Sequence, residues 1–188
     1  MPPAAEVAST TTSASPELVG RTSCMLAPVE VSLWVKQYVS TNNGALLYAS
    51  NFSVGVNLFF ELNRQLAKLM KTQTDYQISV EETHHIQKLD APSGTAVSLL
   101  EDILQINEQY DGWSLEPIKE QQIAVKAHRE PNVPGTHQIS YDSAIDSIKI
   151  EHIAHNRKGF ALGAVIAAEF LYQRKGIYTM SDVLKTTL

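Results

Sequence analysis

The stretch that decides the fold reads Glu82-Thr83-His84-His85-Ile86-Gln87-Lys88-Leu89-Asp90-Ala91-Pro92-Ser93-Gly94-Thr95-Ala96. Residues 76–82, which lead into it, alternate between two sets of side chains, and this period of two is typical of a strand. Residues 97–106, which follow it, carry apolar side chains at helical spacing. Pro92 favours an extended conformation for Ala91. The stretch is therefore predicted to connect a strand to a helix, and that helix is predicted to begin at Ser93, Gly94 and Thr95.

The same stretch concentrates groups that can exchange protons. His84 and Lys88 stand four positions apart, so on a regular strand or helix they lie on one side and could address one bound molecule. Histidine titrates near neutral pH, and lysine can donate a proton when burial or nearby cations lower its pKa. His85 would face another way on a strand and is better suited to hold a carboxylate.

The Ser93-Gly94-Thr95 turn predicts an anion site at the start of the helix. Helix N-termini present backbone N–H groups and the positive end of the helix dipole, and Gly94 allows a close approach. Two alternatives without a functional role remain: the turn is only a helix cap, and the histidine pair is only structural. Zinc is disfavoured, because no helical His-x-x-x-His pair or cysteine ligand occurs, and we predict no metal site.

The rest of the chain mixes helical and strand patterns. Helices are predicted over residues 29–39, 54–71, 160–172 and 179–184, and strands over residues 45–49, 76–82, 123–126, 136–141 and 147–153. Residues 1–16, rich in Ala, Ser, Thr and Pro, predict a disordered tail. The expected fold is α+β, within the α/β family: a mixed four-stranded open sheet with flanking helices, beside a remnant of a Rossmann-like domain.

Composition narrows the class of protein. The 188 residues are 44% hydrophobic and 19% charged, which is typical of a globular protein with a buried core. The formal net charge of -5 argues against nucleic acid as a partner, and no apolar run approaches a membrane span. Cys24 is the single cysteine, so no internal disulfide is possible. We expect a soluble, cytoplasmic protein.

Four segments occur in an order that points to one family. Besides residues 82–96 they are Ala49-Ser50-Asn51-Phe52-Ser53-Val54-Gly55-Val56-Asn57, Val133-Pro134-Gly135-Thr136 and Asn156-Arg157-Lys158-Gly159-Phe160-Ala161-Leu162-Gly163-Ala164. Together they resemble the dihydrodipicolinate reductase family, the 4-hydroxy-tetrahydrodipicolinate reductases, from Leu46 to the C-terminus. The resemblance implies reduction of a cyclic dicarboxylate with NADH or NADPH in diaminopimelate and lysine biosynthesis. It also implies a homotetramer assembled through the central sheet.

The resemblance assigns roles to individual positions. His84 matches the family's acid/base histidine and Lys88 the lysine proposed as proton donor. Three further residues match substrate contacts: His85, Gly94 and Thr95. The interdomain segment that touches the nicotinamide cofactor matches Ala49, Ser50, Asn51 and Phe52, and Arg157 falls where the family often has an arginine near the cofactor.

The family's Gly-rich dinucleotide loop has no counterpart here. Gly20 is the only glycine before Gly44, and of a Gly-Thr-Thr-Gly-Trp cofactor loop only Gly20 and Thr22 match. Most of the cofactor domain is therefore expected to be absent from this chain. We expect a tail over residues 1–20, a dinucleotide-domain remnant over 21–52, a substrate-binding and oligomerisation domain over 53–155, and C-terminal helices over 156–188. The chain is then either a reductase or an inactive fragment that binds dicarboxylate and self-associates.

Overall fold

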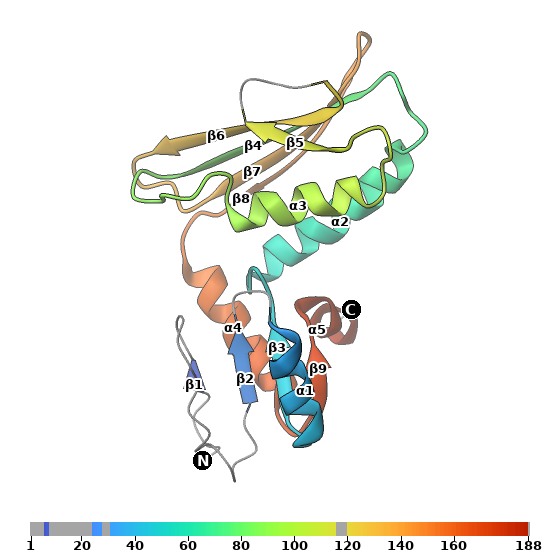
Figure 1. The fold of residues 1–188 in the computed structure, drawn as a ribbon. Coiled ribbons are helices and arrows are strands. Elements are labelled where there is room, and N and C mark those ends of the chain that lie inside the picture. Colours follow the sequence, from blue (N-terminus) through green and yellow to red (C-terminus); the bar gives the residue numbers. More distant parts are fainter. Residues whose placement is uncertain (1–5, 8–23, 28–30, 116–119, 188) are drawn as a thin grey trace. The chain divides into compact units, whose positions relative to one another are not determined.

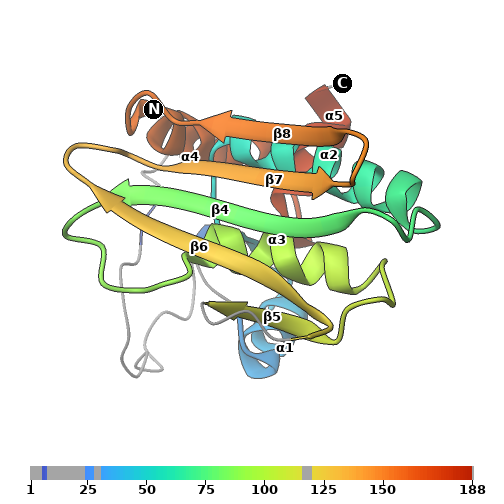
Figure 2. The same cartoon turned by 90° about the horizontal axis from the view of Figure 1, so that it is seen from above.

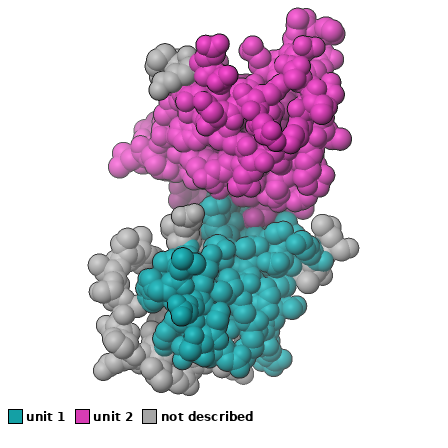
Figure 3. All heavy atoms as spheres, turned by 45° about the vertical axis from the view of Figure 1, so that its right-hand side comes forward, with its two compact units in different colours: residues 1–54, 158–188 teal, residues 55–157 magenta. Residues whose placement is uncertain are grey.

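The chain forms two units, coloured separately in Figure 3. The computed structural model describes residues 6–7, 24–27, 31–115 and 120–187. Unit 2 comprises Gly55–Arg157, and unit 1 comprises Met1–Val54 together with Lys158–Leu188. The stretch from Glu82 to Ala96 lies wholly within unit 2.

Unit 2 is built on a sheet of five strands in the order β5-β6-β4-β7-β8 (Figure 2). The strands are β4 (Gln77–His85), β5 (Gly112–Leu115), β6 (Gln122–Glu130), β7 (Thr136–Asp142) and β8 (Ser147–Ile153). Central β4 runs parallel to β6 and antiparallel to β7. The predicted mixed sheet is confirmed, and it gains one strand because β5 pairs in parallel with β6.

Two helices, α2 (Val54–Met70) and α3 (Gly94–Leu104), cover one face of this sheet (Figure 1). The predicted helical spacing in α2 is confirmed, because its buried residues recur every three or four positions: Val56, Phe59, Phe60, Asn63, Ala67 and Met70. They share one core with side chains of α3 and the sheet, including Leu99, Leu100, Ile103, Ile78, Val80 and Ile139. Burial alternates strictly along β4, so Glu82 and His84 lie on the same covered face as Ile78 and Val80.

Unit 1 contains a parallel sheet in the order β1-β2-β3-β9. The strands are β1 (Glu6–Val7), β2 (Cys24–Ala27), β3 (Ala45–Tyr48) and β9 (Gly176–Tyr178), and the helices are α1 (Leu33–Thr41), α4 (Lys158–Leu171) and α5 (Met180–Thr187). Helix α1 packs against β3 and β9, whereas α4 packs against β2, β3 and α5. Parallel strands with packed helices fit the predicted Rossmann-like remnant.

Some elements of unit 1 differ from the sequence-based expectation. Strands β2 and β9 were not predicted, since each is too short to show a period. Glu6–Val7 pair with β2 inside the segment predicted to be a disordered tail, and the rest of residues 1–20 lies outside the described residues. Among the described helices none has the length and apolar character needed to cross a bilayer.

Candidate functional site

A buried carboxylate, that of Glu82, lies at the centre of the candidate site in unit 2. Glu82 is 1% exposed, because the alternation of β4 turns it towards the covered face of the sheet. The backbone N–H of Ser93 donates to both carboxylate oxygens, at 3.0 Å to Oε1 and 3.1 Å to Oε2. Nη2 of Arg129 lies 3.2 Å from Oε1. Glu82 therefore joins the end of β4 to the start of α3.

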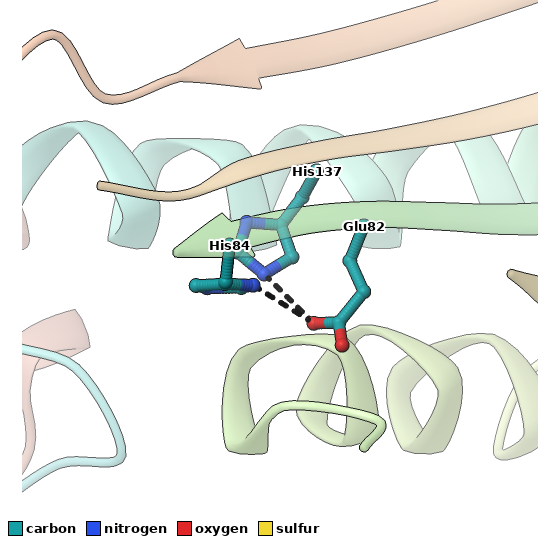
Figure 4. A group of neighbouring side chains, drawn as sticks. All are labelled: Glu82, His84 and His137. Atoms are coloured by element: carbon teal, nitrogen blue, oxygen red, sulfur yellow. Dashed lines mark ion pairs between the residues drawn. The ribbon is translucent and has the colours of Figure 1, made fainter. Parts of the chain in front are cut away.

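Two histidines approach the same carboxylate from the sheet (Figure 4). Nδ1 of His84 lies 3.4 Å from Oε2 of Glu82, and Nε2 of His137 lies 3.7 Å from it. The two rings meet edge to face, with centroids 5.0 Å apart and an interplanar angle of 73°. Strand register explains the cluster, since Glu82 pairs with His137 across β4 and β7. Nε2 of His137 also lies 3.1 Å from Oγ of Ser93.

The environment shifts two pKa values strongly. Burial by itself raises the pKa of Glu82, but contact with His84 and the hydrogen bonds from Ser93 outweigh it and lower this pKa to about 2. Burial, aided by the charge of a protonated His84, lowers the pKa of His137 to about 3. Near neutral pH the site thus contains an ionised Glu82 and an uncharged His137.

Glu82, His84 and His137 also have the spacing of a metal site, since one ligand atom from each lies within 4.8 Å of the others. The carboxylate that a cation would need is already engaged, however. Both oxygens of Glu82 accept the N–H of Ser93, and the cationic Arg129 lies at 3.2 Å. A positive neighbour and occupied lone pairs disfavour cation binding, so the three side chains fit a hydrogen-bonded cluster better than a metal centre.

The loop after β4 holds Lys88 against Asp90. Nζ of Lys88 lies 2.9 Å and 2.8 Å from the two carboxylate oxygens of Asp90, and this hydrogen bond lowers the pKa of Asp90. The predicted shared side for His84 and Lys88 assumed a regular element, but β4 ends at His85 and Lys88 lies in a turn. Arg129 fixes this loop by donating to the carbonyl oxygens of Lys88 and Asp90, at 3.2 Å and 2.6 Å.

His85 lies on the opposite face of β4 from His84, as the alternation predicts. Its Nε2 lies 2.9 Å from Nη2 of Arg157, and its Nδ1 lies 3.1 Å from Oε1 of Gln87. A guanidinium can only donate, so Nε2 accepts from Arg157 and Nδ1 carries the proton. Arg157, matched on sequence to a position near the cofactor, thus lies beside the predicted carboxylate-holding histidine.

The start of α3 is a capped helix N-terminus. Oγ of Ser93 accepts the backbone N–H of Ala96 at 3.2 Å, so the cap expected from the sequence is present. Thr95 is buried, whereas a Cβ added to Gly94 would find no atom within 4 Å. There is therefore open space beside the backbone of Gly94, where the sequence predicts an anion.

The predicted cofactor residues belong to unit 1. Ala49, Ser50, Asn51 and Phe52 follow the carboxyl end of β3, whereas Gly20 and Thr22 lie outside the described residues. Gly163 of α4 packs directly on this segment, because a Cβ there would lie 1.8 Å from the carbonyl oxygen of Phe52. The absence of a side chain at Gly163 thus lets the helix hold the segment at backbone distance.

Three residues of the site were not predicted from the sequence: Glu82, Arg129 and His137. A signal existed for Glu82, since a glutamate in the buried phase of an alternating strand needs partners. Arg129 and His137 come from strands 47 and 55 residues further along the chain, so only the strand register, which sets Arg129 opposite His84, brings them in.

Comparison with known proteins gives consistent matches. The family model "Dihydrodipicolinate reductase, C-terminus" matches residues 55–184. The 4-hydroxy-tetrahydrodipicolinate reductase of Christiangramia forsetii is 51% identical over 157 residues, covering 80% of this chain and 66% of the relative. That of Buchnera aphidicola subsp. Schizaphis graminum is 38% identical over 151 residues, covering 75% and 55%. The chain thus spans roughly 55 to 66% of the length of these relatives.

Solved structures also share the fold. The dipicolinate-bound dihydrodipicolinate reductase from Paenisporosarcina sp. TG-14 has a TM-score of 0.65 and is 20% identical, covering 84% of this chain and 63% of that chain. At this identity the likeness supports the fold alone.

Proposed function

Because the chain belongs to the dihydrodipicolinate reductase family by its match over residues 55–184, we propose that it acts in the reduction of 4-hydroxy-tetrahydrodipicolinate to tetrahydrodipicolinate. The reaction uses NADH or NADPH and serves diaminopimelate and lysine biosynthesis in the cytoplasm. The observation that carries the proposal is the cluster around Glu82, which sets a histidine beside a capped helix N-terminus in unit 2.

In this proposal the ring carboxylates of the substrate bind to His85, Gly94 and Thr95. Arg157 beside His85 adds positive charge where one carboxylate would bind. The N-terminus of α3 favours a second anion through its dipole, and the open space at Gly94 leaves room for it.

His84 and Lys88 then handle the proton. A positioned general acid contributes typically ~10²–10⁴-fold to a rate. Since the ammonium of Lys88 is paired with Asp90, a substrate carboxylate would compete with Asp90 for it, and binding would redirect Lys88 towards the substrate.

Residues 49–52 are proposed to contact the nicotinamide, which supplies the hydride when bound. They follow the carboxyl end of a parallel strand, where ligands of open α/β sheets usually bind. Gly20 and Thr22 are proposed as further contacts. The fit is partial, because no Gly-rich turn for the pyrophosphate occurs in this sequence.

A second function is favoured by the way the proposed substrate and cofactor residues divide between the two units. Every proposed substrate group lies in unit 2, whereas the cofactor side lacks its phosphate loop. The alternative is therefore a non-catalytic protein that binds a dicarboxylate and self-associates. In both cases residues 53–155 form the substrate-binding and oligomerisation domain, residues 21–52 are a remnant of the dinucleotide domain, and residues 156–188 pack towards it. We propose a homotetramer built on the sheet face turned away from α2 and α3.

Calorimetric titrations with dipicolinate, NADH and NADPH, combined with a reductase assay, test the proposal. Reductase activity that falls in His84→Ala and Lys88→Ala, but persists in the exposed control His155→Ala, supports catalysis. Dipicolinate binding without nucleotide binding or turnover supports the alternative. No binding of any of the three ligands would contradict both functions.

A further inference from the structure

We propose that Glu82 is a positioning residue that fixes the ring of His84 and aligns it with both the start of α3 and the loop carrying Lys88. The inference rests on the proposed function, because it explains how one carboxylate holds the proton-handling side and the anion-binding side of the site together. The family resemblance assigns no role in the reaction to Glu82.

The burial of the Glu82 carboxylate is unfavourable unless specific partners compensate for it. Glu82 shares the covered face of β4 with Ile78 and Val80, where an apolar side chain would suffice for folding. Burying an ionised carboxylate costs several kcal/mol unless partners offset it. Its partners all belong to the site: Ser93, Arg129 and the rings of His84 and His137.

The contact with His84 selects one tautomer of that ring. Nδ1 of His84 is buried and, among the described residues, has no hydrogen bond of good geometry; the oxygen that it faces is Oε2 of Glu82, at 3.4 Å. A lone pair facing a carboxylate is repelled, so Nδ1 carries a proton. Nε2 is then the nitrogen that exchanges a proton with a ligand. It lies beside Gly135, where an added Cβ would come within 3.1 Å of it.

His137 restricts the same ring without adding charge. Its ring stands edge to face against that of His84, and burial keeps it neutral near pH 7. Among the described residues, Glu82 is the charged group within ion-pair distance of His84, at 3.4 Å, and the guanidinium of Arg129 lies 3.2 Å from the same carboxylate. Of these only Glu82 attracts a proton to His84, so the carboxylate sets the orientation of the ring.

The same carboxylate also sets the positions of the two flanking segments. Through the N–H of Ser93 it fixes the first residue of the turn that continues into Gly94 and Thr95. Through Arg129, which bonds the carbonyl oxygens of Lys88 and Asp90, it fixes the loop after β4. A displacement of Glu82 would therefore misalign all three parts at once, and a 1 Å misplacement can cost ~10²-fold in rate.

The test compares Glu82→Gln with Glu81→Gln in the full chain. Glu81 is the next residue on β4, faces the other side of the sheet and pairs there with His128 at 2.7 Å, so it is a matched glutamate–histidine control. Two-dimensional ¹H–¹⁵N spectra, with His84 signals assigned from His84→Gln, identify the protonated nitrogen. We expect protonated Nδ1 in the wild type and in Glu81→Gln, and loss of that preference in Glu82→Gln. We also expect kcat to fall ~10²-fold in Glu82→Gln with little change in KM.

The spectroscopic result stands apart from the proposed reaction. If the wild type has no turnover, the proposed function fails, while the tautomer of His84 still decides the role of Glu82. A wild-type His84 protonated only at Nε2 overturns the inference, and this measurement needs no variant to fold. Unchanged kcat in a folded Glu82→Gln also overturns it. So does a joint shift of the His84 and His137 signals on addition of Zn²⁺ alone, which would make the cluster a metal site.

Discussion

Replacing Gly163 with alanine tests the packing that holds the proposed cofactor segment. The new Cβ would lie 1.8 Å from the carbonyl oxygen of Phe52 and 2.7 Å from its carbon, far inside the ~3.5 Å of a favourable contact. Both obstacles are backbone atoms, so α4 and the segment must separate by more than ~1 Å. Such overpacking lowers the free energy of unfolding by about 3 kcal/mol, the upper end of its usual range. Alanine has a higher helix propensity than glycine, which offsets about 1 kcal/mol of this loss. We expect a net loss of roughly 2 kcal/mol.

Gly159→Ala in the same helix is the matched control. A Cβ at Gly159 would lie 3.5 Å from Oγ of Ser53, which is ordinary contact, so this change should be neutral or stabilising by up to ~1 kcal/mol. Urea unfolding followed by circular dichroism measures both variants, and hydrogen exchange locates the effect. Gly163→Ala should lose protection in β3 and α4 while β4, β6 and β7 keep theirs. Equal stability of the two variants, or protection lost mainly in unit 2, would refute the reasoning.

Three further predictions concern unit 2. The pKa of Glu82 is about 2 in the folded state against an ordinary value of 4.5, so its ionised form stabilises the fold by about 3 kcal/mol above pH 4.5, and this stabilisation is lost as the pH falls towards 2. The pKa of His137 is about 3 against 6.5, so keeping this ring uncharged begins to destabilise the fold as the pH falls below 6.5. Urea titrations of His137→Gln should therefore show a free energy of unfolding that changes less between pH 6.5 and 4.5 than in the wild type. Arg129→Gln should lower the free energy of unfolding by about 2 kcal/mol, because Glu82 loses a charged partner; wild-type stability would contradict this. Gly135→Ala, at a φ of 157° and with its Cβ 3.1 Å from Nε2 of His84, should displace that ring and change its NMR signals; an unperturbed His84 spectrum would contradict the geometry.

Long periodic segments could be predicted from the sequence, and short paired ones could not. Helix α2 was predictable because six buried residues share one face, and β4 because its alternation runs over nine residues. Strand β9 has three half-buried residues and exists because Ala45, Leu46 and Leu47 of β3 pair with it. Pairing of this kind depends on tertiary contacts, which a local pattern does not contain.

The candidate site divides in the same way. The cap at Ser93 and the opposed faces of His84 and His85 follow from local spacing, and both are present. The pairing of Lys88 with Asp90 was not predicted, because it depends on where β4 ends and a turn begins. His137 depends on register: a shift of one residue between β4 and β7 would move it to the other face of the sheet.

The two candidate functions differ in unit 1 alone. Glu82, His84, His85 and the Ser93–Thr95 turn come from one run of fourteen residues, and Arg129, His137 and Arg157 also belong to unit 2. Their mutual hydrogen bonds therefore form within that unit, and all the residues proposed to hold the dicarboxylate belong to it. The proposed catalysis, in contrast, depends on unit 1, because the segment held by Gly163 is the proposed nicotinamide contact. Loss of turnover with intact dicarboxylate affinity is thus the expected result of damage to unit 1, whereas damage at Glu82 should lower turnover while nucleotide affinity remains.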